Sequence, residues 1–463
     1  MFFLVLGLSF LYSCKDDDTI FGGATNLQIS ADTVFFDTVF TRQNPGIPKS
    51  INKQFVVVNN EDQKVLTNIS LAGASNSPFR INVDGMSGRT FDNVEIRSGD
   101  SIFVFVELTI DPNNDPQALP LIVRDSIVFN TNGAIQDVKL IAWGQDAHYF
   151  RRDSIETDVV WADKEKPYLI YDYFYVKEGA TLTIEPGVRV HFSPYAWLWV
   201  EGTINIKGTK AEPVFMEGDR LQTTYDQVPG QWNGIRIHYP SKDNKITHLR
   251  SKNGTVGVFC DSIPSNGNPN LVVSHSEFRN MAYDGISGRM SHIVATNCVM
   301  ANCGRFGFFG SWGGTYDVRH CTMHTGSGTF ARRDPTCAFS NVERDEIGAL
   351  VRTFDLTATL ANSIMYGNND DELGFDLVDD TRYNVNVSHN IFNTTQLYNL
   401  QESPFNNKLN VDPMFVNSRG YDYQLDSTSP AIDSGLGGLG ISVDFCGLAR
   451  DAKVDIGAFE YQK

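Results

Sequence analysis

Apolar and polar residues alternate in short runs from residue 27 to residue 146, the pattern of strands that bury one face. The stretches 54–58 and 101–106 are two clear examples. Turn-forming residues separate the runs, and Asn132-Gly133 is a strong signal for a two-residue hairpin. About seven short strands with no helical period predict a β-sandwich for residues 27–146.

A different period begins after Trp161. An Asn or a His recurs there, each time two positions after an apolar residue. These positions are 27, 22, 23, 21, 21 and 27 residues apart: His248, His275, Asn297, His320, Asn341, Asn362 and His389. A repeat of this length is too short to fold alone, so it must stack on its neighbours.

Short stacked repeats of strand-forming residues predict a parallel β-helix, which we expect over residues 147–403, with residues 404–463 at its C-terminal end. A tight turn between two strands needs a residue near the left-handed region, where Asn and His are enriched. We therefore interpret the recurring Asn and His as a ladder of turn residues rather than as catalytic groups. The same alignment directs Cys298 and Cys321 into the core.

Motifs at both ends of this region resemble a known family. Residues 180–190 and 231–235 closely resemble the opening coils of right-handed β-helix proteins found among bacterial surface lipoproteins. Residues 412–415 and 455–460 resemble the C-terminal region of the same proteins. Members of the group include lyases, adhesins and many proteins without an assigned activity.

The N-terminal part has a resemblance of its own. The turn at residues 97–100 and the closing residues 141–144 are similar to bacterial Ig-like domains related to the ASH family. The two resemblances together imply an all-β chain, in which an N-terminal Ig-like β-sandwich is followed by a right-handed parallel β-helix with a C-terminal capping segment. Modules of the first kind usually space or bind rather than catalyse.

Residues 1–13 are uncharged and mostly apolar, and the run is too short to span a bilayer, so we expect an export signal. No Lys or Arg precedes it, which points to a true start upstream of Met1. Residues 11–14 resemble the lipobox of bacterial lipoproteins, which implies acylation of Cys14, for example by palmitate. Residues 14–26 then form a tether, whose acidic residues fit either a surface-sorting signal or a plain spacer. We expect a lipid-anchored, surface-exposed protein of the outer membrane.

The net charge and the spacing of the cysteines restrict which partners and cofactors we expect for this protein. The chain carries 38 Lys and Arg against 55 Asp and Glu, a formal net charge of −17. Nucleic acids and anionic membrane surfaces require basic patches, so we expect no nucleic acid as partner and membrane contact through the lipid anchor only. The six cysteines after Cys14 show no CxxC pair and no Cys/His spacing of a zinc site, and we expect no cofactor.

One dense acidic cluster is a candidate metal site. Asp370, Asp371, Glu372 and Asp376 could bind a structural Ca²⁺ through their carboxylate oxygens. The alternative, a solvated loop that interrupts the coil, is favoured. The cluster superficially resembles the paired aspartates of polygalacturonases, but the Gly-His-Gly and Arg-Ile-Lys elements of that family are absent. We therefore assign no catalytic residue.

Aromatic residues are the candidate ligand contacts. Trp232, Trp312 and Tyr316 lie in Gly-rich or loop-like contexts, where a flat ring could stack on the face of a sugar. Trp197 and Trp199 share this context. For each of these residues, packing under a loop or at an end of the coil is the alternative.

These features predict a non-catalytic surface lipoprotein whose β-helix binds an extracellular or cell-wall polysaccharide. The non-catalytic prediction rests on the lack of any recognisable catalytic constellation in the sequence. Sites on β-helices are assembled from different coils and leave little local signature. A polysaccharide lyase acting on acidic glycans is therefore the first alternative, and a structural or adhesive surface protein is the second.

Overall fold

The computed structural model describes residues 19–41, 51–110, 121–261, 263, 267–326 and 331–462. The predicted export signal and Cys14 lie outside these residues. The chain divides into two compact units, residues 1–146 and residues 147–463. No helix in the described ranges is long and apolar enough to cross a membrane.

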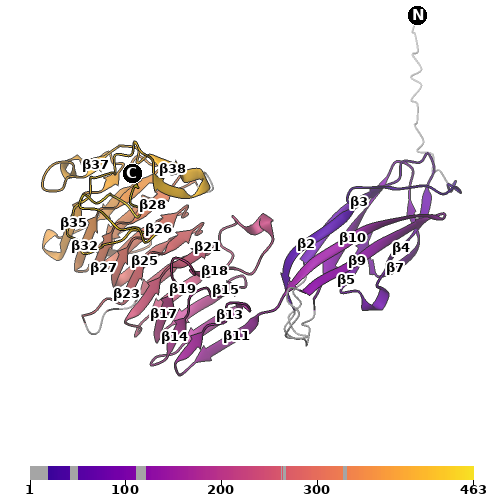
Figure 1. The fold of residues 1–463 in the computed structure, drawn as a ribbon, viewed down its shortest axis with the longest axis horizontal. Helices are drawn as coiled ribbons and strands as arrows, with labels where there is room; N and C mark the ends of the chain where they lie inside the picture. Colours follow the sequence, from indigo (N-terminus) through magenta and orange to yellow (C-terminus); the bar gives the residue numbers. More distant parts are fainter. Residues whose placement is uncertain are drawn as a thin grey trace, which may run out of the picture. The chain divides into compact units, whose positions relative to one another are not determined.

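The first unit is a β-sandwich of two five-stranded sheets (Figure 1). One sheet has the order β1 (Gln28–Ile29), β3 (Ile51–Val58), β8 (Ser101–Leu108), β5 (Phe79–Val83) and β6 (Met86–Gly88). The other has the order β2 (Thr33–Phe40), β10 (Ala134–Gln145), β9 (Leu121–Thr131), β4 (Val65–Leu71) and β7 (Thr90–Ile96). Alternate residues of both sheets meet in one core, in which Phe36, Phe79 and Phe129 are fully buried. The alternating pattern thus predicted the sandwich correctly.

The predicted hairpin in this unit is present. Strands β9 and β10 pair antiparallel on either side of Asn132-Gly133. These two residues have φ values of 53° and 94°, as a tight two-residue turn with a left-handed backbone requires. Strand β10 also pairs parallel with β2, so the sheet joins the start of the unit to its end.

The second unit is a parallel β-helix in which successive coils stack in three columns of strands (Figure 1). The first column contains part of β13 (Tyr168–Val176), β16 (Trp197–Val200), β19 (Gly234–His238), β22 (Val258–Asp261), parts of β25 (Ile286–Thr296) and β27 (Phe308–Arg319), β29 (Cys337–Ser340) and β34 (Leu373–Asp376). The second column contains β12 (Val159–Trp161), β14 (Thr181–Ile184), β17 (Thr203–Lys207), β20 (Asn244–Thr247), β23 (Leu271–Ser274), the ends of β25 and β27, β32 (Leu356–Ala361) and β35 (Tyr383–Ser388).

The third column begins where β11 (His148–Ile155) pairs along β13. It continues through β15 (Arg189–Phe192), β18 (Val214–Gly218), β21 (Leu249–Lys252), β24 (Glu277–Arg279), β26 (Val299–Ala301), β28 (Thr322–Thr325), β33 (Ile364–Gly367), β36 (Ile391–Phe392) and β37 (Lys408–Leu409). Side chains that point inward from all three columns form one continuous apolar core along the coil.

The recurring Asn and His lie where the chain turns from the second column to the third. Six of them have φ values between 48° and 56°: His248, His275, Asn297, His320, Asn362 and His389. The predicted ladder of left-handed turn residues is therefore confirmed for these six. Cys298 and Cys321, which follow two of them, are fully buried, as predicted.

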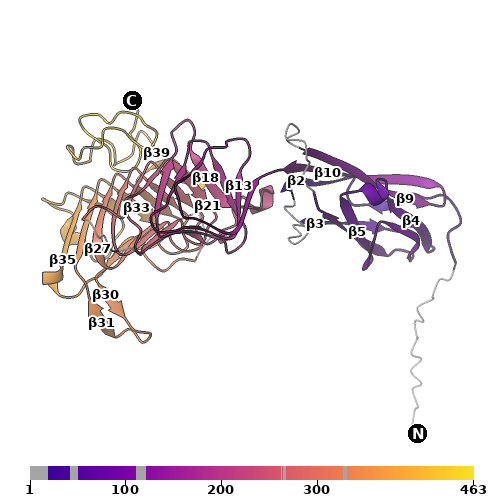
Figure 2. The ribbon, with the colours of Figure 1, turned by 90° about the horizontal axis from the view of Figure 1, so that it is seen from below.

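Asn341 does not belong to this ladder, and that step of the prediction is wrong. The residues before it form β29 in the first column, where Phe339 pairs with Gly310. The chain then makes a hairpin of β30 (Val342–Arg344) and β31 (Leu350–Thr353), which projects from the coil in Figure 2. The ladder passes directly from His320 to Asn362, so these two residues border one long coil. The sequence around Asn341, near the middle of this coil, matches the repeat only by chance.

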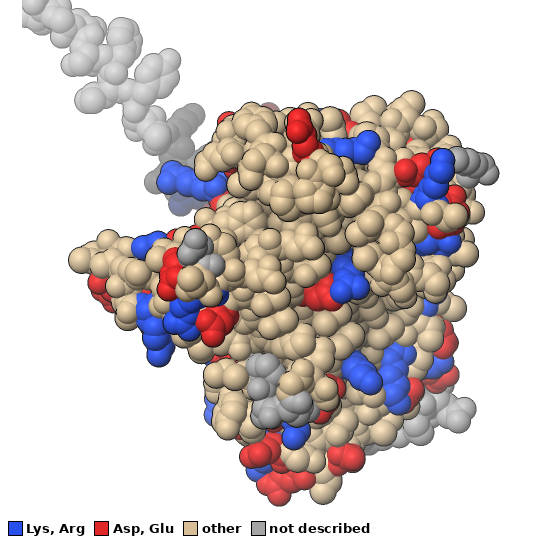
Figure 3. All heavy atoms as spheres, turned by 90° about the vertical axis from the view of Figure 1, so that its left-hand side faces the viewer, with Lys and Arg blue, Asp and Glu red and all other residues tan. Residues whose placement is uncertain are grey.

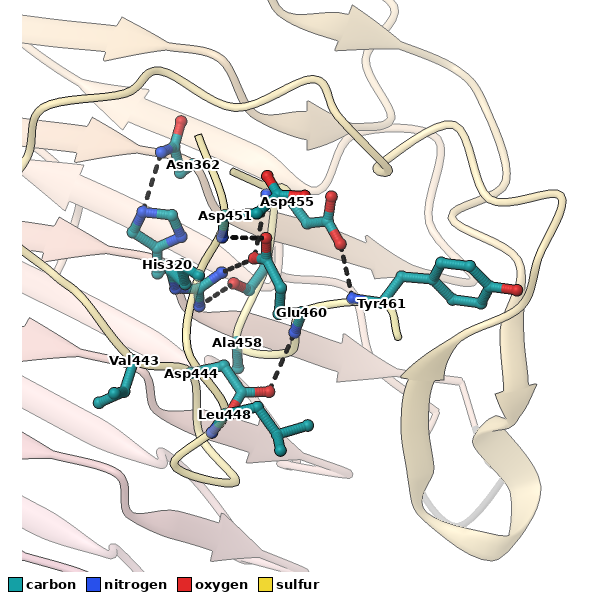
Figure 4. A network of polar contacts seen from close by, with 12 residues as sticks. His320, Asn362, Val443, Asp444, Leu448, Asp451, Asp455, Ala458, Glu460 and Tyr461 are labelled. Carbon is teal, nitrogen blue, oxygen red and sulfur yellow. Dashed lines mark hydrogen bonds and ion pairs between the residues drawn. The ribbon is translucent and has the colours of Figure 1, made fainter. Parts of the chain in front are cut away.

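Residues 410–462 pack along the ladder, and we call this segment the clasp (Figure 4). The Asn362 side chain donates to the carbonyl of Leu436 at 2.9 Å and accepts from its N–H at 2.7 Å. Inside the clasp, Arg450 donates to Glu460 at 2.8 Å, and both side chains are almost completely buried. The clasp also contains the short hairpin of β38 (Phe415–Asn417) and β39 (Asp422–Leu425).

Candidate functional site

The first column of the β-helix presents an outer face rich in aromatic and charged side chains. Alternate residues of its strands point into the core, and the residues between them are half-buried or exposed. The backbone register places Tyr175 beside Trp199 and Trp199 beside Arg236. Arg236 in turn pairs with Phe259 on the next strand. Residues far apart in the sequence therefore form one row along the coil.

A surface hollow of about 420 Å³ lies at the start of this row, lined by Asp172, Tyr173, Tyr175, Trp197, Trp199 and Glu201. Glu201 organises it, because its carboxylate accepts hydrogen bonds from Trp199 Nε1 at 3.2 Å and from the Tyr175 hydroxyl. The hydrogen bond to this carboxylate raises the pKa of Tyr175 to about 12. The phenol therefore stays protonated at neutral pH. The ring of Tyr173 is 41% exposed and forms an open wall of the hollow.

The row continues as a stack in which aromatic rings and guanidinium groups adjoin one another, here named the arginine–aromatic stripe: Trp199, Arg236, Phe259, Arg289, Trp312, Phe354 and Arg352. The Arg236 Cζ atom lies 4.8 Å from the ring centroid of Trp199 and 5.2 Å from that of Phe259. The Arg289 Cζ atom lies 5.3 Å from the centroid of Phe259 and 4.5 Å from that of Trp312. Each of these contacts is within the range of a cation–π interaction.

The stripe ends at the base of the β30–β31 hairpin. The rings of Trp312 and Phe354 are stacked, with centroids 6.0 Å apart and an interplanar angle of 2°. The Arg352 Cζ atom lies 4.6 Å from the centroid of Phe354. Since Arg352 belongs to β31, the hairpin that interrupts the ladder also lengthens the stripe.

A buried carboxylate holds the centre of the stripe in place. One oxygen of Asp261 accepts from Arg236 Nη2 at 2.5 Å, and the other lies 2.7 Å from His238 Nδ1. The side chain of Asp261 is only 8% exposed, whereas that of His238 is 37% exposed. The charge of Arg236 is thus neutralised locally, and the imidazole of His238 is fixed through one nitrogen.

This arrangement suits a ligand that has both flat apolar faces and polar edges. Aromatic rings offer area for stacking, and guanidinium, imidazole and phenol groups donate hydrogen bonds beside them. Sugar rings have this combination of an apolar face with hydroxyl groups around the edge. On the face of the molecule shown in Figure 3, basic and acidic side chains are interspersed, and that face presents no patch of one sign.

Of the three aromatic residues predicted as ligand contacts, only Trp312 lies on the stripe. Trp232 is fully buried, stacks on Phe192 with centroids 4.1 Å apart, and donates from Nε1 to a backbone carbonyl at 3.0 Å. Tyr316 is 1% exposed, and its hydroxyl donates to the Gly313 carbonyl at 2.9 Å. The prediction for Trp232 and Tyr316 is corrected, because neither ring can reach a ligand.

The four carboxylates predicted to bind calcium do not converge. Glu372 is fully buried and accepts from Arg332 at 2.7 Å, and Asp371 accepts from the N–H of Thr395 at 2.7 Å. Asp376 forms an ion pair with an arginine on the projecting hairpin, and Asp370 is exposed. Within the described ranges, no group of three or more His, Cys, Asp or Glu residues is placed to hold a metal ion. The predicted calcium site is therefore corrected to a set of separate structural contacts.

Sequence reasoning did not identify Arg236, His238, Phe259, Asp261 or Arg289 as candidate ligand-binding residues. A signal exists for Arg236 and Phe259, because each occupies an outward position between inward apolar residues of a first-column strand. His238 and Asp261 are the last residues of their strands, and Arg289 is followed by the half-buried Met290, so alternation marks them less clearly. Finding the stripe requires the register between coils, which connects strands that are separated by 22 residues or more.

Comparison with known proteins supports the fold of this region. The family model described as a pectate-lyase-like beta helix domain matches residues 153–259, from β11 to β22. An 85-residue stretch is 34% identical to Protein bark beetle of Drosophila melanogaster, covering 18% of this chain and 3% of that much longer protein.

Two solved structures are similar to parts of this chain. The catalytic unit of a thermostable GH87 alpha-1,3-glucanase from Streptomyces thermodiastaticus aligns with 73% of this chain and 74% of its own, at 11% identity and a TM-score of 0.30. The ASH/PapD-like domain 7 of human CEP192 aligns over its whole length with 31% of this chain, at 10% identity and a TM-score of 0.18. Neither score is high enough to inform function. The family match and the three columns of strands together identify the second unit as a parallel β-helix.

Proposed function

We propose that this protein is a lipid-anchored outer-membrane protein that binds an extracellular or cell-wall polysaccharide along the arginine–aromatic stripe without cleaving it. The observation that carries the proposal is the stack of rings and guanidinium groups that runs from Trp199 to Arg352. Isolated exposed aromatics are common on protein surfaces, but a continuous row of stacked side chains over several coils offers a polymer repeated contacts.

The geometry of the coil suits a long ligand. Stacked strands repeat about every 4.8 Å, so the stripe offers contacts at regular steps along the coil axis. The hollow beside Trp197 and Trp199 gives one end of the stripe a deeper subsite. The similarity of residues 153–259 to the pectate-lyase-like family supports a carbohydrate as the ligand.

The anchor is proposed from the sequence. Residues 11–14 have the form of a lipobox, and acyl chains on Cys14 supply membrane attachment that a single chain would not. The tether and the β-sandwich then act as a spacer between the lipid and the β-helix. Labelling with a palmitate analogue, with Cys14→Ser as the control, tests this part separately.

One observation favours a second candidate function, eliminative cleavage of a uronate polymer. His238 is fixed through Nδ1 by the buried carboxylate of Asp261, which leaves Nε2 as a potential base beside Arg236. Binding without cleavage is preferred because Arg236 is already neutralised by Asp261 and is not free to balance a second carboxylate.

The test is a glycan array probed with the full-length protein, run beside an ultraviolet assay for unsaturated products from alginate, pectin and glycosaminoglycans. The proposal expects binding to at least one polysaccharide and no unsaturated product. Unsaturated product that disappears in His238→Gln would establish the lyase instead. Binding to whole cells without binding to any free glycan would favour an adhesin and contradict the proposal.

A further inference from the structure

Within the described residues, one guanidinium of the stripe has no anionic partner. Arg289 lies over the rings of Phe259 and Trp312, at 5.3 Å and 4.5 Å. Among the described residues, no Asp or Glu forms an ion pair with Arg289, and no acceptor forms a hydrogen bond with its side chain. It is half-buried, so part of its hydration shell is replaced by the two rings.

The other two arginines of the stripe are neutralised by carboxylates. Arg236 pairs with Asp261 at 2.5 Å, and Arg352 pairs with Glu343 at 3.0 Å. The register places Asp261 on the strand next to Arg289, but both of its oxygens are already engaged on the opposite side. The unpaired state of Arg289 therefore follows from the way its neighbours are arranged.

We infer that Arg289 receives one anionic group of the bound polysaccharide, a carboxylate or a sulfate, while uncharged sugars pack on the neighbouring rings. This inference rests on the function proposed above. A guanidinium whose faces are covered by rings still presents N–H groups in its own plane, the geometry that binds an oxyanion through two parallel hydrogen bonds. Partial burial strengthens such a bond relative to one in water.

The net charge of the chain limits how densely the ligand can be charged. The chain has a formal net charge of −17, which repels a polymer that carries a charge on every sugar. Among the residues that the structure describes, Arg289 is the one cation of the stripe without a carboxylate partner, and it lies between Phe259 and Trp312. A sparsely charged polymer therefore fits this stripe better than a polyuronate does.

The experiment measures binding of the full-length protein to an array of neutral, sparsely charged and densely charged polysaccharides. We expect the sparsely charged polymers to bind best, and Arg289→Gln to weaken their binding about tenfold more than it weakens the binding of neutral polymers. Carboxyl-reduced and desulfated forms of the preferred polymer then show which anion is recognised. Arg289→Lys keeps the positive charge but loses the planar guanidinium with its two parallel N–H donors. This variant should therefore retain part of the preference for sparsely charged polymers.

The matched control is Arg220→Gln, because Arg220 also lies over an aromatic ring but is exposed and lies outside the stripe. A thermal melt of each variant separates lost binding from lost folding. The inference would be overturned if Arg289→Gln weakened the binding of neutral and charged polymers equally. It would also be overturned if the wild type preferred neutral or densely charged polymers. In both cases the proposed function would still stand. Failure of the wild type to bind any polymer would overturn both.

Discussion

The Nδ2 atom of Asn362 lies 2.9 Å from the Nε2 atom of His320, although 42 positions separate the two residues in the sequence. The contact shows that the chain between them forms one extended coil rather than two regular ones. The projecting hairpin lies within this coil, and it brings Arg352 and the ring of Phe354 to the end of the stripe. The irregularity of the ladder is therefore linked to the length of the candidate binding face.

Asn362→Gly should loosen the clasp. Glycine keeps the left-handed backbone at this position, where φ is 50°, but removes both hydrogen bonds to Leu436. We expect a loss of about 1–3 kcal/mol in unfolding free energy and faster proteolysis of residues 410–462. Asn406→Gly is the control, because Asn406 is exposed and also has a positive φ, of 51°. Equal protease sensitivity of the two variants would show that Asn362 does not hold the clasp.

His320→Asn should reduce the acid sensitivity of the fold. Burial lowers the pKa of His320 to about 3. The unfolded chain takes up this proton below about pH 6.5 and the folded chain does not, so stability is complete above that pH and falls as the pH drops. From pH 6.5 to pH 5, the wild type should lose about 2 kcal/mol that the variant keeps.

Denaturant unfolding of wild type and His320→Asn at pH 7 and at pH 5 gives this difference directly. Asparagine occupies the equivalent ladder position at Asn297 and Asn362, so the turn is preserved. Parallel loss of stability in the two proteins would mean that His320 does not cause the acid sensitivity.

Trp232→Ala should be strongly destabilising. The side chain is fully buried and stacks on Phe192, so its removal leaves a large cavity that costs about 3–5 kcal/mol. Trp199→Ala removes a half-buried ring and should cost less than about 1.5 kcal/mol of stability. Thermal melts of the two variants test the assignment of one tryptophan to the core and of the other to the surface. Similar melting temperatures would be inconsistent with that assignment.

Glu372→Gln should also destabilise the fold, and calcium should not compensate. The variant leaves the buried guanidinium of Arg332 without its counter-charge, at a cost of about 3–5 kcal/mol. The wild type should melt at the same temperature with calcium or with a chelator, because its carboxylates are used in separate contacts. Asp370→Asn, at an exposed position of the same cluster, is the neutral control. A calcium-dependent melting temperature that Asp370→Asn abolishes would restore the metal site.

Much of the fold could be predicted from local patterns. Alternation identified the sandwich strands, and the spacing of Asn and His identified six turns of the coil. Alternation also distinguishes the two faces of a strand: Leu198 and Val200 point inward, so Trp199 between them must point outward. By the same rule Tyr316 lies on the inward side of β27, together with Val318.

The remaining features depend on contacts between coils. Trp232 lies before β19 rather than within it, so strand alternation does not specify its direction. Asn341 fits the repeat in its local sequence, and only strand pairing assigns it to another place. The stripe needs three or more coils in register before Arg236 and Arg289 can be recognised as neighbours of the same ring.

The most direct test of the central claim is a binding titration of the preferred array polysaccharide with wild type, Trp197→Ala/Trp199→Ala and Phe215→Ala. Trp197 and Trp199 line the hollow at the start of the stripe, whereas Phe215 is an exposed ring on the third column. The account predicts that the double variant binds at least about fivefold more weakly, since each lost aromatic contact contributes about 0.5–1.5 kcal/mol, and that Phe215→Ala binds like the wild type. Unchanged affinity in a folded double variant, or equal loss in Phe215→Ala, would contradict it.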